Sequence, residues 1–255
     1  MELDQKPYVD NQKRRVISFV GGGGKTTTMY ALADIFRKNG KKVVVTTSTH
    51  LQAPSEEIRA RNLKEIRRLW ESGKIVVIGN DCKIEKNLVE EVDVSKSVRK
   101  MCMPSPDFLQ EVLREADVIL IEADGAKHLP CKVPKEKEPV IISECTDVIA
   151  VMGMDALGER LEKVCFRKEL AIQFLNVDVT HRMTPEDLAQ ILLSDQGSRK
   201  SVGLRDYFIV LNKCDNEKIR EQADRICSLL KVQGVKKVML TSDANREEEL
   251  KKYFS

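Results

Sequence analysis

Residues 16–39 of this 255-residue chain are VISFVGGGGKTTTMYALADIFRKN, in which four consecutive glycines separate an apolar run from an amphipathic segment. The run Val16–Val20 is typical of a buried strand, and Thr26–Asn39, followed by Gly40, is typical of a helix with a C-terminal glycine. Glycine has no Cβ, so backbone N–H groups in such a run can point at an anion in front of the helix N-terminus. The order of strand, glycine run and helix therefore predicts a phosphate cradle.

Lys25 and Thr26 follow the glycines directly. A lysine at this position reaches the outer phosphates of a nucleotide, and the threonine hydroxyl can ligate Mg²⁺. The stretch resembles the variant loop of the deviant P-loop NTPases, G-K-G-G-x-G-K-[ST]-[ST], although Val20 stands where that pattern has its first lysine. A glycine-rich strand–helix turn without a ligand is the alternative. The predicted nucleotide-binding residues here are Gly21, Gly22, Gly23, Gly24, Lys25, Thr26 and Thr27.

Outward from this stretch, short β-branched runs alternate with longer segments of helical period, which predicts a doubly wound, mostly parallel α/β sheet with helices on both faces. The expected strands are Val16–Val20, Lys42–Thr46, Lys74–Ile78, Asp117–Ile121, Asp147–Met152, Tyr207–Leu211 and Val235–Leu240. The expected helices are Thr26–Asn39, Ser55–Ser72, Ser105–Glu115, Arg167–Leu175, Thr184–Leu193 and Asn216–Val232. We expect residues 1–255 to form one nucleotide-binding domain, with an insertion or flap at about 81–104.

The expected strand Asp117–Ile121 is followed by two acids, Glu122 and Asp124. In an open α/β sheet, the carboxyl ends of the strands line the ligand crevice, so these carboxylates should face the glycine run. They would hold Mg²⁺ together with Thr26 and position an attacking water, which makes Lys25, Glu122 and Asp124 the candidate catalytic residues. The alternative is that one acid only caps the following loop.

A second motif, N-K-x-D, follows the strand Tyr207–Leu211 as Asn212, Lys213 and Asp215. It is similar to the guanine-recognition motif of GTPases, in which the aspartate accepts hydrogen bonds from two guanine donors that adenine lacks. Ser242, after the next strand, is a candidate for a contact with the base. The pattern favours GTP over ATP, with an ordinary cap at a strand end as the alternative.

The composition argues against several classes of partner and site. The 43 Lys and Arg residues nearly balance the 40 Asp and Glu residues, so net charge gives no argument for a nucleic acid. No apolar run approaches the roughly 20 residues of a membrane span, and residues 1–15 have no apolar core of the secretory type. The 7 cysteines are scattered and the 3 histidines lack helical metal-pair spacing, so we expect a cytoplasmic protein without a disulfide framework or a zinc site.

Two further segments are ambiguous from sequence alone. Thr46–His50 carries consecutive hydroxyl groups at a strand end, where they would face a nucleotide or a substrate, although threonine is also an ordinary strand residue. Lys127–Pro139 is basic and contains several prolines, so it is either a substrate or switch loop or an exposed charged loop.

Taken together, VGGGGKTTTMYALA, VVVTTSTHL, IEADGAKHLPCKVPKEKEPVI, VMGMDALGERLEKVCFRKEL and MTPEDLA resemble the YqeC family in this order, from about Arg15 to Thr241. The resemblance implies an accessory protein for the maturation of selenium-dependent molybdenum hydroxylases, with such an enzyme or its cofactor as partner. The family pattern covers Gly22, Gly24, Lys25, Thr26, Thr47–His50, Glu122–Ala126, Lys132, Pro134, Glu138, Pro139, Gly153, Asp155, Gly158 and Arg167.

The leading hypothesis is an accessory NTPase that uses Mg²⁺ with GTP or ATP. The sequence leaves its oligomeric state open. Hydrolysis would be slow because neither an obvious arginine finger nor a water-positioning glutamine stands out, and Arg167 is a candidate arginine finger. Two alternatives stay open at this point: a P-loop kinase or nucleotidyl transferase acting on a small acceptor held by Lys127–Pro139, and a nucleotide-dependent binding switch without hydrolysis.

Overall fold

The computed structural model describes residues 14–82 and 99–254, and its central feature is an eight-stranded parallel sheet. The strand order is β13-β12-β10-β1-β8-β2-β5-β4. The bounds of these strands are Arg15–Gly21 (β1), Val43–Thr47 (β2), Arg59–Ala60 (β4), Val76–Ile78 (β5), Val118–Glu122 (β8), Asp147–Gly153 (β10), Asp206–Asn212 (β12) and Val238–Thr241 (β13). The predicted doubly wound, parallel α/β fold is confirmed, and every expected strand is present.

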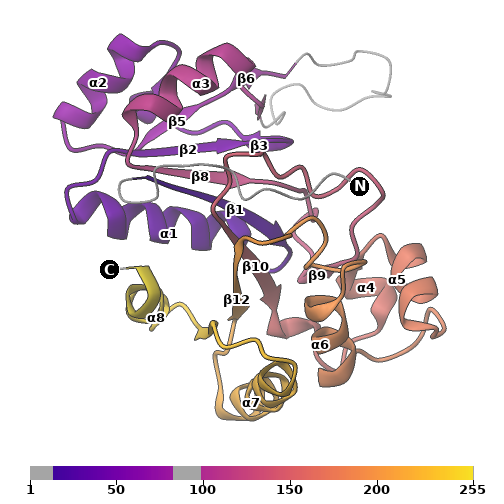
Figure 1. Ribbon diagram of the computed structural model, residues 1–255. Helices are drawn as coiled ribbons and strands as arrows, with labels where there is room; N and C mark the ends of the chain where they lie inside the picture. The colour runs from indigo at the N-terminus through magenta and orange to yellow at the C-terminus, as the bar shows by residue number, and fades with distance from the viewer. Residues whose placement is uncertain (1–13, 83–98, 255) are drawn as a thin grey trace.

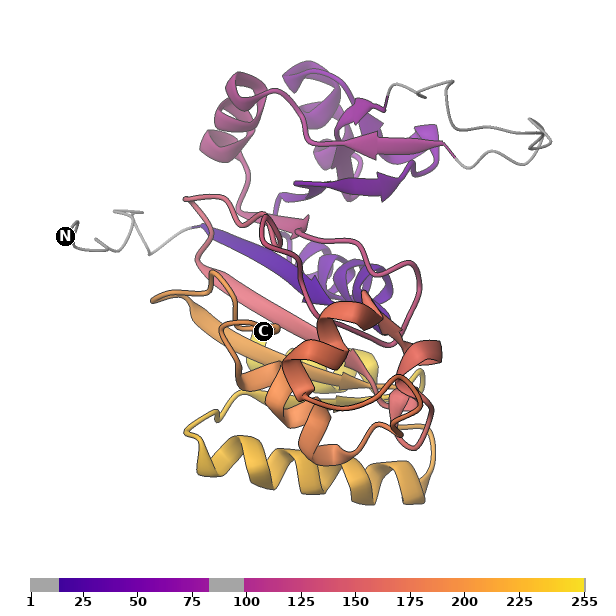
Figure 2. The ribbon, with the colours of Figure 1, turned by 90° about the vertical axis from the view of Figure 1, so that its right-hand side faces the viewer.

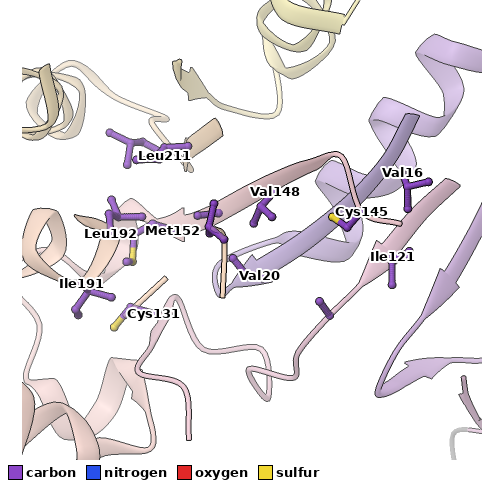
Figure 3. Close-up of a cluster of buried hydrophobic side chains, with 14 of the residues drawn as sticks. Val16, Val20, Ile121, Cys131, Cys145, Val148, Met152, Ile191, Leu192 and Leu211 are labelled. Atoms are coloured by element: carbon purple, nitrogen blue, oxygen red, sulfur yellow. The ribbon is translucent and has the colours of Figure 1, made fainter. Parts of the chain in front are cut away.

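The sheet is buried on both faces, which is why its strands are continuously apolar. In β1, Val16 and Val20 pack into one core, whereas Ile17 and Phe19 pack into a second core on the opposite face. Figure 3 shows part of the first core, where Val20 lies near Val148 of β10 and Val16 lies near Cys145. Side chains alternate across a strand, so one apolar run supplies both cores.

The two faces are covered by different helices. The first core is completed by α2 (Leu63–Glu71), α3 (Pro106–Glu115), α5 (Lys168–Leu175), α6 (Pro185–Leu193) and α7 (Glu217–Val232). The second is completed by α1 (Lys25–Lys38) and α8 (Arg246–Phe254), which lie beside each other in Figure 1. In Figure 2, α2 and α3 stand at one end of the sheet and α7 at the other.

The shorter elements lie outside the main sheet. Two small sheets form here. One has two strands, β9 (Cys131–Lys132) and β11 (Cys165–Phe166), and the other has three, in which β7 (Lys100–Cys102) pairs with both β3 (His50–Gln52) and β6 (Asn80–Asp81). The remaining elements are α4 (Leu161–Val164) and two 3-10 turns, η1 (Glu56–Ile58) and η4 (Met154–Ala156). All 7 cysteines are free. No helix among residues 14–82 and 99–254 is long and apolar enough to cross a bilayer.

The predicted helix Ser55–Ser72 is wrong in its first half. Ser55 caps the turn η1, β4 then pairs with β5 as the edge strand of the sheet, and α2 begins only after Asn62, whose side chain accepts a hydrogen bond from the N–H of Glu65. Asparagine is among the residues that most favour the N-cap position, which explains why the helix begins there. The predicted insertion or flap at about 81–104 falls largely on residues 83–98, outside the described residues, although β6 and β7 flank it.

The topology places the glycine run at a reversal of strand order. From β1 the chain passes through α1 to β2, and β8 then returns to fill the position between β1 and β2. After β8 the chain moves to the opposite side of β1 to form β10. Ligand crevices in open α/β sheets lie outside the carboxyl ends of strands at such reversals, so the site is expected where β1, β8, β10 and β12 end.

Candidate functional site

The glycine run forms a tightly packed loop between β1 and α1. Gly22 N–H donates to the carbonyl of Val151 and Gly23 N–H to the carbonyl of Leu129, both at 2.9 Å. The N–H of Gly21 donates to Oδ2 of Asp124 at 3.2 Å. The N–H groups of Gly21, Gly22 and Gly23 therefore already have acceptors within the protein. The N–H groups that have no partner within the helix belong to the first turn of α1, from Gly24 onward.

Lys25 begins α1 and turns its side chain back toward the loop. Its ammonium donates to the carbonyl of Gly21 at 2.5 Å and lies 3.1 Å from Oδ1 of Asp124. Both side chains are at least 95% buried. The predicted phosphate-binding lysine and the predicted carboxylate thus meet in one ion pair, which keeps Lys25 at the mouth of the loop.

Thr26 and Glu122 form the second contact between the loop and β8. The Thr26 hydroxyl donates to Oε2 of Glu122 at 2.7 Å. Burial raises the pKa of Glu122 and outweighs the opposing effects of Lys25 and of the Thr26 hydrogen bond. A hydroxyl and a carboxylate are hard oxygen donors of the kind that Mg²⁺ takes, so this pair fits a magnesium ion that also binds phosphate. No cluster of three or more His, Cys, Asp or Glu side chains suited to a metal occurs in the part of the chain that the structure describes.

A second buried lysine, Lys132 of β9, lies on the other side of Asp124. Its ammonium is 3.1 Å from Oδ2 of Asp124 and 2.8 Å from Oε2 of Glu138, and it donates to the carbonyl of Gly125 at 2.9 Å. Arg167 pairs with the other Glu138 oxygen at 2.7 Å. Burial favours the neutral form of Glu138, but Lys132 and Arg167 outweigh it and hold the pKa of Glu138 below its usual value. The candidate arginine finger is therefore engaged in an ion pair.

Asn212, at the end of β12, fastens the glycine loop to the N-K-x-D segment. Its Nδ2 donates to the carbonyl of Gly23 at 2.8 Å, and its Oδ1 accepts from the hydroxyl of Thr241 at 2.9 Å. The residue is buried. Asn212 therefore braces the two loops and brings the second motif against the first.

The other candidates for base recognition differ in whether their side chains are already bonded to other residues. Lys213 pairs with Asp155 at 2.5 Å and has a φ of 66°, whereas Asp215 is exposed and makes no hydrogen bond or salt bridge within the described chain. The N–H and hydroxyl of Ser242 both donate to Oδ1 of Asn245, so these groups are directed away from a base contact. Thr27 is exposed on the first turn of α1.

Thr46–His50 and Lys127–Pro139, the two segments that were ambiguous from sequence, also lie at this edge of the sheet. Thr47 donates to the Glu122 carbonyl at 2.8 Å and Ser48 to the Val140 carbonyl at 2.6 Å, so both hydroxyls hold backbone. Within Lys127–Pro139, the segment Leu129–Pro130 lies against the glycine loop through the Leu129 carbonyl described above. Sequence reasoning did not find this contact. No local pattern in Lys127–Pro139 indicated it, because the contact joins segments far apart in the chain.

The parallel sheet, the glycine loop at its strand reversal, and the lysine and threonine that follow it define a protein of P-loop NTPase-like fold. The family model of the YqeC protein matches residues 17–169. The Escherichia coli (strain K12) protein YqeC is 31% identical over 218 residues, covering 80% of each chain. This chain therefore belongs to the YqeC family, as the sequence resemblance predicted.

Solved structures with a similar arrangement are more distant. They include HypB from Helicobacter pylori in complex with nickel, at 13% identity and a TM-score of 0.42, covering 95% of this chain and 84% of that one. The MinC:MinD cell division complex of Aquifex aeolicus has 13% identity and a TM-score of 0.43, covering 92% and 86%. A plasmid partition protein from Borrelia burgdorferi has 14% identity and a TM-score of 0.38, covering 95% of each chain. We draw no functional conclusion from similarity at this level.

Proposed function

We propose that this chain binds a nucleoside triphosphate with Mg²⁺ at the glycine loop and hydrolyses it slowly. The observation that carries the proposal is the pairing at the end of β8, where Lys25 lies 3.1 Å from Asp124 and Thr26 lies 2.7 Å from Glu122. One lysine for phosphate charge and an oxygen pair for Mg²⁺ thus stand side by side at the start of one helix. A turn with a purely structural role would need neither.

Each residue has a separate task in this proposal. Lys25 neutralises charge on the outer phosphates, while Thr26 and Glu122 hold Mg²⁺, and Asp124 orients water. The metal would supply charge neutralisation at the phosphates when bound. The ion pair between Arg167 and Glu138 supports slow turnover, because that guanidinium is already engaged.

We further propose that guanine is favoured over adenine. Asp215 follows a segment that Asn212 fastens to the glycine loop, and its exposed carboxylate is available to accept hydrogen bonds from guanine N1 and N2. Because Ser242 bonds Asn245, we assign base selection to Asp215 alone.

Family membership extends the proposal to a biological role. We propose a cytoplasmic accessory protein in the maturation of selenium-dependent molybdenum hydroxylases, with such an enzyme or its cofactor as client. The free cysteines support a reducing compartment. Co-purification of a tagged chain with a molybdenum hydroxylase, lost in a Lys25→Met variant, would be the expected result. Recovery of the enzyme to the same extent with Lys25→Met would remove nucleotide control from the proposal.

The direct test is calorimetric titration of the full chain with GTP and ATP, each with and without Mg²⁺. We expect tighter binding with Mg²⁺, a preference for GTP of about tenfold or about 1.4 kcal/mol, and loss of binding in Lys25→Met. Lys64→Met, on the exposed face of α2, is the matched control and should bind as the parent does. Asp215→Asn should reduce the preference for guanine. Unchanged binding in Lys25→Met would overturn the phosphate site.

Product analysis separates hydrolysis from the other two reactions. Release of inorganic phosphate from GTP supports hydrolysis. Labelled phosphate or nucleotide on a small acceptor would instead indicate a kinase or transferase, and binding without any turnover would indicate a switch.

A further inference from the structure

We propose that Lys132 is the permanent counter-ion of Asp124, which frees Lys25 to leave Asp124 and bind phosphate. The inference rests on the proposed nucleotide site and deepens it by adding a positioning residue from β9. Its basis is the juxtaposition of two buried ammonium groups on the two oxygens of one buried carboxylate, Lys25 at Oδ1 and Lys132 at Oδ2, both at 3.1 Å.

The two ammonium groups differ in how firmly they are held. Lys132 is 1% exposed and is fixed by Asp124, by Glu138 and by the carbonyl of Gly125. Arg167 holds Glu138 from its other side, so Lys132 is anchored through two carboxylates. Lys132 therefore stays in place as a fixed charge and does not itself reach a ligand.

The contact of Lys25 with Asp124 is easier to release. Oδ2 of Asp124 accepts the N–H of Gly21 and faces Lys132, but Oδ1 makes no aligned hydrogen bond and has only the ion pair with Lys25. The hydrogen bond of Lys25 goes to the carbonyl of Gly21. Departure of Lys25 therefore breaks no hydrogen bond to Asp124, while the other oxygen keeps both of its partners.

Charge explains why the second lysine matters. A buried carboxylate that loses its partner is strongly destabilised, so an Asp124 paired only with Lys25 would hold that lysine against a phosphate. With Lys132 in place, the carboxylate stays compensated when Lys25 moves. Lys132 thus sets the affinity for phosphate without contacting it.

The test is calorimetry with Mg²⁺ and the non-hydrolysable analogue guanylyl imidodiphosphate, on full-length variants whose melting temperatures are also recorded. Lys132→Met should weaken binding by about tenfold or more, because Lys25 must then stay on Asp124. Lys132→Arg, which keeps the positive charge beside Asp124, should bind more tightly than Lys132→Met. The deciding variant is Asp124→Asn combined with Lys132→Met, because it removes the charge that Lys132 compensates.

If the inference holds, the double variant binds as tightly as Asp124→Asn alone, so the loss caused by Lys132→Met disappears. If Lys132 only holds the fold together, the two losses add and the inference is overturned. The double variant and Lys132→Arg decide the question even if Lys132→Met fails to fold, since neither leaves Asp124 charged and unpaired. Absence of binding in the parent chain would overturn the proposed function itself, whereas additive losses with a binding parent would overturn only the role of Lys132.

Discussion

Replacing Gly23 by alanine tests whether the glycine loop is as closely packed as the structure describes. Gly23 has a φ of 73°, and an added Cβ would lie 2.2 Å from the nitrogen and 2.4 Å from the Cα of Gly153. Both are backbone atoms, so the clash cannot be relieved by rotating a side chain. The left-handed conformation costs about 1–2 kcal/mol and overpacking about 1–3 kcal/mol, which gives a loss of about 2–5 kcal/mol in the free energy of unfolding.

Gly73→Ala is the matched control. Gly73 has a φ of 66° with no atom within 4 Å of an added Cβ, so this variant carries the conformational cost alone. Urea unfolding of both variants, followed by circular dichroism without nucleotide, measures the difference. We expect Gly23→Ala to lose more stability than Gly73→Ala by about 1–3 kcal/mol. Equal losses would refute the close approach of the loop to β10.

Three other predictions concern neighbouring parts of the molecule. Asn212→Ala leaves the Gly23 carbonyl and the Thr241 hydroxyl without their buried partner and should cost about 2–4 kcal/mol in urea unfolding, and a loss near zero would contradict the bracing role. The pKa of Glu138 is lower in the folded chain, so its contribution to stability is present above the unfolded pKa of about 4.3 and is lost as the pH falls through the folded value. Unfolding followed from pH 6 to pH 3 should therefore depend less on pH in Glu138→Gln, and an unchanged profile would argue against this ion pair. Phe254→Ala removes a buried ring whose centroid lies 4.7 Å from that of Phe208, and it should lower the free energy of unfolding by about 3–5 kcal/mol. A melting temperature equal to that of the parent would mean that α8 is not packed against the sheet.

The sequence predicted the sheet well because a strand buried on both faces leaves a continuous apolar run, and most successive strands of the sheet are separated by a helix with recognisable ends. Thr184 is an example, because its side chain and that of Asp187 form a capping box at the start of α6. The errors fall where the signal is short or ambiguous. The β4 residues Arg59 and Ala60 join the sheet only through pairing with β5, and α8 is a highly charged helix whose buried residues are few.

For the site, the sequence by itself determined the chemical groups: the glycine run, Lys25 and Thr26, the carboxylates after β8 and the N-K-x-D segment. These are local patterns whose meaning depends on residue type and on position at a strand end. Tertiary structure alone decided their partners. It joined Asn212 to the carbonyl of Gly23, brought the Leu129 carbonyl to the N–H of Gly23 and engaged Arg167 with Glu138, because contacts between segments far apart in the chain follow from the order of strands in the sheet, which no local spacing encodes.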